Sequence, residues 1–156
     1  MKKWIKIILA VLIVLMLCKP LIFSFFIQKQ NEWILNKIKK NTPQHYLVFR
    51  EFVNEVEKET VWQVVLTSSY RTLEEQQKLR KRDSRNARAG NSKHNLGKAI
   101  DLNLYKNDGL WKDWIVKSSS QKHWESSGIL RIAEKRNLTW GGKFKNYYDP
   151  VHFEIK

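Results

Sequence analysis

Residues 92–101 read SKHNLGKAID, and residues 149–154, near the C-terminal end of the chain, read DPVHFE. Apolar side chains occupy every second position in and just after these stretches: Ile100, Leu102, Leu104, Val151, Phe153 and Ile155. This alternation predicts two β-strands, each with one apolar and one polar face. If both strands lie in one sheet and turn their apolar faces to a common core, Asp101 and His152 project together into the same polar cleft.

A third candidate ligand, His94, precedes the first strand by a short turn at Gly97. Two imidazoles and one carboxylate are ligands that suit zinc, and three protein ligands leave a fourth position open for water, as a catalytic site requires. We therefore predict that His94, Asp101 and His152 bind one zinc ion.

Composition and charge limit the alternatives. The 156 residues suffice for one domain, and 29 Lys and Arg against 15 Asp and Glu give a net charge of +14. Such a charge indicates an anionic neighbour, either a membrane surface, nucleic acid or an acidic polymer, without choosing among them. The single cysteine, Cys18, excludes an internal disulfide, and its apolar surroundings make it a poor catalytic candidate.

The N-terminal residues 1–27 have the composition of a targeting segment. Lysines lead into an apolar run from Ile7 to Cys18, and Leu21–Ile27 is apolar again. The first run has the length of a signal-peptide core, whereas both runs together can span a bilayer. No small-x-small cleavage site follows, which favours an uncleaved signal anchor; a cleaved signal peptide and a buried helix remain the alternatives. Residues 28–44 are expected to be a basic juxtamembrane linker or helix that leads to the domain, and residues 45–156 the domain.

Within the domain the pattern predicts a mixed α+β fold. We expect an amphipathic helix over residues 47–56, a β-branched strand Val61–Leu66, and a helix that begins at a capping box formed by Thr72 and Glu75. Further expected elements are a turn at residues 107–109, a short helix at 111–116, a helix at 124–133 and a strand from Leu138 into a glycine turn. The basic stretch Lys78–Arg88 indicates a solvated helix end and loop rather than a nucleic-acid patch, because no aromatic residue lies among its charges. Attraction to an anionic wall polymer is a further option for this stretch.

Together these residues resemble the M15 metallopeptidases, the zinc enzymes that cut peptidoglycan stem peptides as D-alanyl-D-alanine carboxypeptidases or L-alanyl-D-glutamate endopeptidases. The resemblance covers Val64–Ile155 and rests on Ser68, Tyr70, Arg71, Gln77, Ser92, His94, Gly97, Ala99, Asp101, Trp140, Gly141, Gly142, Phe144, Asp149, His152 and Phe153. The order of Trp140, the two glycines and Asp149 before the last histidine is similar to the endopeptidase branch. The carboxypeptidase branch tends to have Glu and Trp where this chain has Asp149 and Val151.

The resemblance implies a Hedgehog/DD-peptidase-like domain with a small antiparallel sheet, with Asp149 as general base and acid and Arg71 stabilising the oxyanion. Glu154, on the face of His152, is a candidate to orient that ligand. The candidates for substrate contacts or for supporting the ligands are Ser92, Tyr70 and Trp140 as well as Glu154.

Three classes of function remain on the sequence alone: a zinc peptidase, a wall-binding module of the same fold without catalysis, and a basic nucleic-acid protein. We expect the first, acting on L-Ala-D-Glu bonds of stem peptides, with D-Ala-D-Ala carboxypeptidase activity as the alternative. Such a domain is useful only in the cell envelope. We therefore expect it outside the cytoplasm, held at the membrane by residues 1–27 or secreted if these are cleaved. We expect a monomer that binds no nucleic acid.

Overall fold

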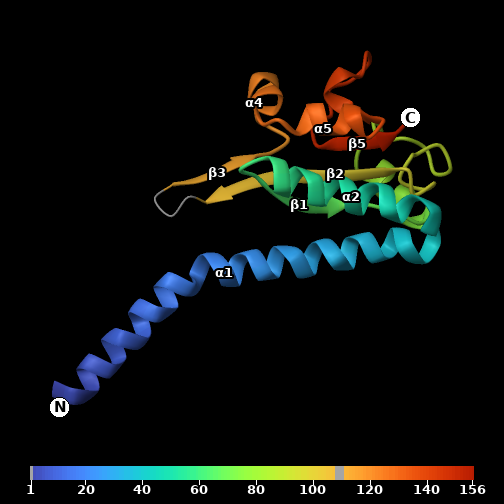
Figure 1. Ribbon diagram of the computed structural model, residues 1–156. Coiled ribbons are helices and arrows are strands. Elements are labelled where there is room, and N and C mark those ends of the chain that lie inside the picture. Colours follow the sequence, from blue (N-terminus) through green and yellow to red (C-terminus); the bar gives the residue numbers. More distant parts are fainter. Residues whose placement is uncertain (1, 108–110) are drawn as a thin grey trace.

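The structure is a computed structural model that describes residues 2–107 and 111–156, with side chains described from residue 19 onward. The elements follow in the order α1 (Lys2–Asn41), α2 (Pro43–Glu59), β1 (Gln63–Ser68), α3 (Leu73–Arg82), β2 (Ala99–Asn107), β3 (Lys112–Ile115), α4 (Gln121–Ser126), α5 (Ile129–Lys135), β4 (Leu138–Trp140), a 3-10 turn (Gly141–Lys143) and β5 (His152–Ile155) (Figure 1). This arrangement confirms the predicted mixed α+β class.

The strands form one antiparallel sheet in the order β1-β2-β5-β4, and β3 pairs with the far end of β2. On the core face of the sheet the alternating apolar residues are fully buried, among them Ile100, Leu102, Leu104 and Phe153. The helices α2 and α5 contact each other and join this core, so that the ring of Phe52 from α2 lies 5.4 Å from the ring of Phe153. The opposite face of β2 and β5 is thereby left for polar side chains.

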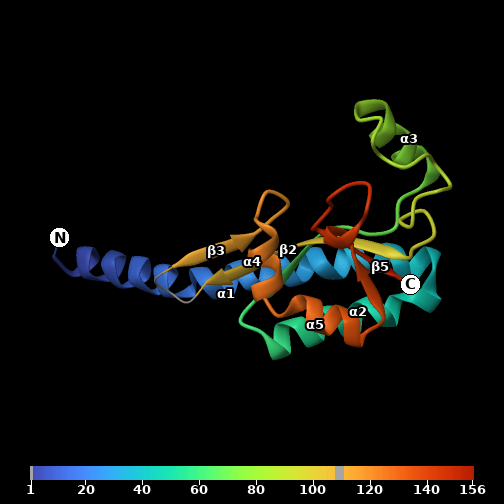
Figure 2. The same ribbon diagram turned by 90° about the horizontal axis from the view of Figure 1, so that it is seen from above.

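The helix α3 begins at the predicted capping box. The Thr72 hydroxyl accepts a hydrogen bond from the Glu75 backbone N–H, and the Glu75 carboxylate accepts one from the Thr72 backbone N–H. Figure 2 shows α3 standing clear of the sheet, on the side away from α2 and α5.

The second half of α1 covers the edge strand β1, although residues 28–44 were expected to precede the domain. The amide of Asn31 donates to the Val64 carbonyl and accepts from the Leu66 N–H, both at 2.8 Å, so it satisfies backbone groups of an edge strand. Ile34, Leu35 and Ile38 belong to the main core cluster. The basic composition of residues 28–44 did not indicate this packing, because the lysines lie on the solvent side of α1 while the apolar positions face the sheet. The packed unit therefore begins before residue 45.

The expected membrane segment falls largely on residues 1–18, whose side chains lie outside the described part of the chain. Their backbone is the start of α1 from Lys2 onward. Within the part that the structure describes, no helix combines the length and the apolar character needed to cross a bilayer.

Three smaller predictions need correction. The expected helix at residues 111–116 is the strand β3, because Trp114 pairs across the sheet with Tyr105, with ring centroids 4.7 Å apart. The expected helix at 124–133 is two short helices, since Gly128 between them adopts φ +84°. Leu47, the first residue of the expected amphipathic helix, is exposed and does not belong to its apolar face. The turn predicted at residues 107–109 lies mostly outside the described residues.

The burial of α1 against the sheet gives a stability prediction. Ile38 is 0% exposed, so Ile38→Ala leaves a cavity and is expected to lower the free energy of unfolding by about 2–5 kcal/mol. The exposed neighbour Lys40→Ala is the matched control, expected to change it by less than about 0.5 kcal/mol. Urea denaturation of the two variants measures the difference; equal, near-zero effects would mean that α1 is a linker after all.

Candidate metal centre

The register of two strands brings the first pair of ligands together. In the antiparallel pairing of β2 with β5, Asp101 lies directly opposite His152. Their neighbours Ile100 and Phe153 are fully buried on the other face of the sheet. Because successive side chains alternate between faces, burying the apolar pair places Asp101 and His152 together on the polar face. The predicted pairing of these two residues is confirmed.

The third ligand comes from the turn that precedes β2. The Ser92 hydroxyl accepts a hydrogen bond from the His94 backbone N–H at 3.3 Å, and the Gly97 N–H donates to the His94 carbonyl. Gly97 has φ +61°, and a side chain there would collide with Thr42 on the loop after α1. Ser92, predicted as a substrate or supporting residue, is buried and shapes the turn that carries His94.

The donor atoms of the three residues converge on one point. His94 Nε2 lies 3.3 Å from His152 Nδ1 and 3.2 Å from Asp101 Oδ1, and His152 Nδ1 lies 3.0 Å from the same Oδ1. Ligands bound tetrahedrally to zinc at about 2.0–2.1 Å are about 3.3 Å from one another. The spacing of the three atoms therefore suits zinc, and this group is the metal-ligand cluster formed by the described residues.

The outer nitrogens of both rings are also hydrogen-bonded, which fixes the tautomers. His94 Nδ1 donates to the Ser69 carbonyl at 2.7 Å, and His152 Nε2 donates to Glu154 Oε2 at 3.1 Å. The inner nitrogens then present lone pairs to the centre, as metal ligation requires. Glu154 thus has the supporting contact predicted for it, whereas Ser69 was missed because a backbone carbonyl leaves no signal in the sequence.

Without a cation, two lone pairs and a carboxylate would face one another at the centre of the site. This arrangement shifts the pKa values of His152 and Asp101. Burial opposes the charge on His152, but hydrogen bonds to Asp101 and Glu154 outweigh it and raise the pKa of His152 to about 9. Burial likewise opposes the charge on Asp101, yet attraction to His94 and hydrogen bonds from both rings hold its pKa well below the ordinary value. The site favours a positive charge at its centre, which supports the fit of a divalent ion.

Arg71 is fixed beside the cluster. Its Nη2 forms an ion pair with Asp101 Oδ2 at 2.5 Å, and its Nε donates to the Ser68 hydroxyl at 2.9 Å. The side chain of Asn95 donates to the Arg71 carbonyl at 2.7 Å, and Arg71 N–H donates to the His94 carbonyl, so the end of β1 is tied to the ligand turn. Arg71 therefore orients the carboxylate of Asp101, one of the three candidate metal ligands.

Of the two adjacent glutamines of α3, Gln77 was named in the resemblance, but Gln76 is the one that contacts Arg71. Gln77 is exposed, whereas Gln76 is 1% exposed, accepts from Arg71 Nη1 at 3.4 Å and donates to the Ala87 carbonyl at 2.9 Å. Adjacent residues of a helix point in directions about 100° apart, and in α3 it is Gln76 that faces inward.

Asp149 stands in the turn that leads into β5. Its backbone carbonyl accepts from the His152 N–H, and its carboxylate Oδ1 lies 3.1 Å from Lys117 Nζ. The backbone of Gly141 approaches so closely that a Cβ there would lie 2.4 Å from the Asp149 carbonyl oxygen. Asp149 is not one of the three converging ligands, which agrees with a role other than ligation. Its partner Lys117 was not predicted.

The two predicted aromatic contacts differ from expectation. Trp140 is 4% exposed and donates from its indole N–H to the Pro150 carbonyl at 2.7 Å, so it supports the Asp149–His152 turn from the core and offers no surface to a substrate. Tyr70 is partly buried against the core and lines a pocket together with Arg71.

The fold and this geometry define a domain with a candidate mononuclear metal centre of two histidines and one aspartate, built on an antiparallel sheet. Residues 85–155 match the peptidase M15 family model described as D-alanyl-D-alanine carboxypeptidase. The chain is 32% identical over 102 residues to CwlK, the peptidoglycan L-alanyl-D-glutamate endopeptidase of Bacillus subtilis. That match covers 59% of this chain and 60% of CwlK.

Solved structures share the fold. The L-Ala D-Glu endopeptidase ChiX of Serratia marcescens matches with a TM-score of 0.56 at 18% identity, covering 81% of this chain and 86% of that chain. The vancomycin resistance D,D-pentapeptidase VanY of a VanB-type cassette, a mutant in complex with Zn(II), matches with a TM-score of 0.50 at 16% identity, covering 72% and 70%. The family model and these matches confirm the resemblance to the M15 peptidases. Two of the matched proteins, CwlK and ChiX, are endopeptidases of the expected branch.

The raised pKa of His152 predicts a pH-dependent metal affinity. Zinc must displace the proton of this imidazole, so below about pH 9 the affinity is expected to fall about tenfold for each unit that the pH decreases. Competition titrations with a chelator at pH 6, 7 and 8 measure this slope. In Glu154→Gln the imidazolium loses one hydrogen-bonded carboxylate, so the fall should begin at a lower pH. An affinity that is equal at pH 6 and pH 8 in the unaltered protein would contradict the assignment of His152 as a ligand.

Proposed function

We propose that this chain is a zinc-dependent peptidase that hydrolyses peptide bonds in peptidoglycan stem peptides, at the bond between L-Ala and D-Glu. The observation that carries the proposal is the convergence of His94 Nε2, Asp101 Oδ1 and His152 Nδ1 within 3.0–3.3 Å of one another, with both outer ring nitrogens hydrogen-bonded. The endopeptidase activity of the relatives CwlK and ChiX supports this choice of bond.

Cleavage between two D-Ala residues is the second candidate. It is favoured by the description of the matching family model as a D-alanyl-D-alanine carboxypeptidase. It also agrees with the fold shared with the vancomycin resistance D,D-pentapeptidase VanY.

A single zinc ion, when bound, would polarise the scissile carbonyl and make a water molecule acidic near pH 7. We assign the proton transfers to Asp149, which accepts the proton of the attacking water and gives it to the nitrogen of the leaving amine. The partner of Asp149 is Lys117, whose side chain is 69% exposed. Because the lysine end of this pair is exposed to solvent, while the Asp149 side chain is 23% exposed, the carboxylate can exchange the lysine for a water molecule.

Arg71 has two tasks in this proposal. Its Nη2 holds Asp101 Oδ2, which keeps the other oxygen of that carboxylate directed at the metal. Its permanent charge beside the cluster also stabilises negative charge that develops on the carbonyl oxygen.

For the location of the enzyme we propose the cell envelope, with the domain outside the cytoplasm and residues 1–27 at the membrane. The lysines and the apolar run of the N-terminal sequence support this. Protease treatment of spheroplasts should digest the domain while a cytoplasmic marker stays intact; a domain that resists under these conditions would contradict the topology.

Digestion of purified peptidoglycan tests the proposed bond. Zinc-loaded protein should release peptides with a new N-terminal D-Glu, identified by mass spectrometry, and a chelator should stop the release. Release of D-Ala would instead support the carboxypeptidase alternative. If zinc-loaded protein releases no peptide product at all, the result would contradict the proposed peptidase activity and support a wall-binding module without catalysis.

The two aspartates are expected to fail in different ways. Asp149→Asn keeps the shape of the side chain but cannot accept a proton, so zinc should stay bound while kcat falls by about 10²- to 10⁴-fold with KM little changed. Asp101→Asn replaces an anionic ligand by a neutral one, so it should lose zinc itself. Metal analysis after dialysis, together with peptide hydrolysis rates, separates the two outcomes.

The controls for this pair are direct. Loss of zinc from Asp149→Asn would make Asp149 a ligand and overturn its assigned role. Full activity of the same variant would move the search for the base to Glu154, the other carboxylate beside the cluster.

A further inference from the structure

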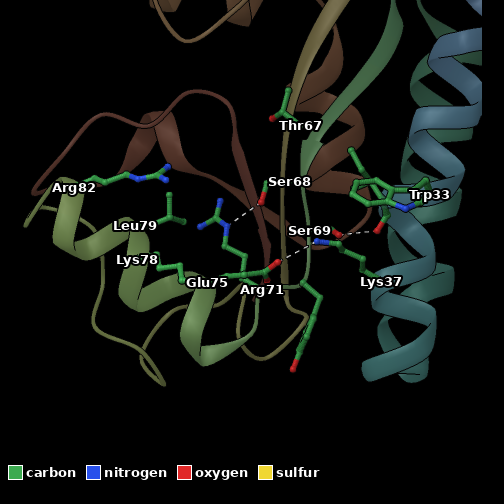
Figure 3. A pocket seen from close by; sticks show the side chains of 12 residues that line it. Trp33, Lys37, Thr67, Ser68, Ser69, Arg71, Glu75, Lys78, Leu79 and Arg82 are labelled. Carbon is green, nitrogen blue, oxygen red and sulfur yellow. Dashed lines mark hydrogen bonds and ion pairs between the residues drawn. The ribbon is translucent and has the colours of Figure 1, made fainter.

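A pocket of about 360 Å³ opens next to the metal centre, between α1 and α3. Its floor is the end of β1 with Ser68 and Ser69, and Figure 3 shows Trp33 and Lys37 of α1 on one side and residues of α3 on the other. Arg71 lies between the pocket and the ligands, because it lines the pocket while its Nη2 reaches Asp101. The pocket therefore borders the candidate metal centre through Arg71.

The lining is strongly cationic. Four basic side chains line the pocket together with one acid: Lys37, Arg71, Lys78, Arg82 and Glu75. The acid is already engaged, since the Glu75 carboxylate caps α3 through the Thr72 N–H at 2.8 Å. The excess of positive charge in a concave site favours an anionic ligand.

The basic residues of α3 can exchange their present partners for such a ligand. Residues 75, 78, 79 and 82 lie on one face of α3, at the spacing of successive helical turns, and this face is turned to the pocket. Lys78 pairs with Glu74 on the exposed surface, where both side chains are more than half accessible, and such pairs contribute little. Arg82 has no ion-pair partner among the residues that the structure describes.

Trp33 adds an apolar side to the pocket. Its side chain is 64% exposed although it is the largest apolar residue on this part of α1, and the ammonium group of Lys37 lies 5.1 Å from its ring centroid. An exposed tryptophan beside basic groups offers a surface to the methylene groups of a ligand whose charged end meets the cations.

We propose that this pocket binds carboxylates of the stem peptide outside the bond that is cut, with Lys78 and Arg82 as the recognition residues and Trp33 packing on the aliphatic part. This rests on the proposed function and names the substrate feature that the enzyme selects: acidic, non-amidated stem peptides. It also gives a role to the first part of the basic stretch Lys78–Arg88.

The test uses the zinc-loaded full chain and two synthetic stem peptides of identical sequence, one with all carboxylates free and one with all of them amidated. The unaltered protein should hydrolyse the acidic peptide with a kcat/KM about tenfold or more above that of the amidated one, since hydrogen bonds to charged groups are the stronger kind. In the double variant Lys78→Gln with Arg82→Gln the preference should disappear, because kcat/KM for the acidic peptide falls to that for the amidated peptide.

The matched control is Arg50→Gln with Lys58→Gln, two exposed residues of α2 that do not line the pocket, so that the same charge is removed elsewhere. This control should keep the preference. Equal hydrolysis of both peptides by the unaltered protein, or a preference that survives in the α3 variant, would overturn the proposal.

Measurements of peptide binding distinguish failure of the proposed function from failure of the proposed pocket. Calorimetry with the zinc-loaded Asp149→Asn protein measures Kd for the same two peptides without turnover. If the unaltered protein cuts neither peptide, the proposed function fails, and tighter binding of the acidic peptide, lost in the α3 variant, still supports the pocket. Equal Kd values for the two peptides would contradict it.

Discussion

The carboxylate of Asp101 is the group on which the site depends, because it contacts both imidazoles and Arg71 at once. One oxygen lies 3.2 Å from His94 Nε2 and 3.0 Å from His152 Nδ1, and the other pairs with Arg71 Nη2. Its position follows from the register of β2, which pairs with Ser68 on one side and with His152 on the other. The register of β1 is irregular between Leu66 and Ser68, which pairs Ser68 with Asp101. The Ser68 hydroxyl in turn accepts a hydrogen bond from Arg71 Nε. Removing this carboxylate would leave a partly buried guanidinium without its partner, so the cost would exceed that of one lost ligand.

The core of the site could be predicted because strand alternation encodes it. Burial of Ile100 and Phe153 fixes which face Asp101 and His152 occupy, and His94 is near in sequence to the first of them. The groups that complete the site could not be predicted in this way. The Ser69 carbonyl that orients His94 carries no residue-type signal, and the pairing of Lys117 with Asp149 joins residues 32 positions apart through the tertiary fold alone.

The same limit explains the errors in the fold. The lysines of residues 28–44 suggested a solvated linker, yet Asn31 and Ile38 on the other face of the same helix cover the edge of β1 and enter the core. The strand β3 was taken for a helix because four residues are too few to show a period, and its partner Tyr105 decides the outcome. Both errors concern packing partners distant in sequence. The correction to α1 also matters for function, since this helix supplies one side of the cationic pocket.

X-ray absorption spectroscopy of the zinc-loaded protein tests the central claim most directly, namely that His94, Asp101 and His152 hold one metal ion. The geometry predicts a four-coordinate zinc with two imidazole nitrogens at about 2.0–2.1 Å, oxygen ligands completing the shell and no sulfur. A zinc ion without imidazole scattering, or a shell that contains the sulfur of Cys18, would contradict the account.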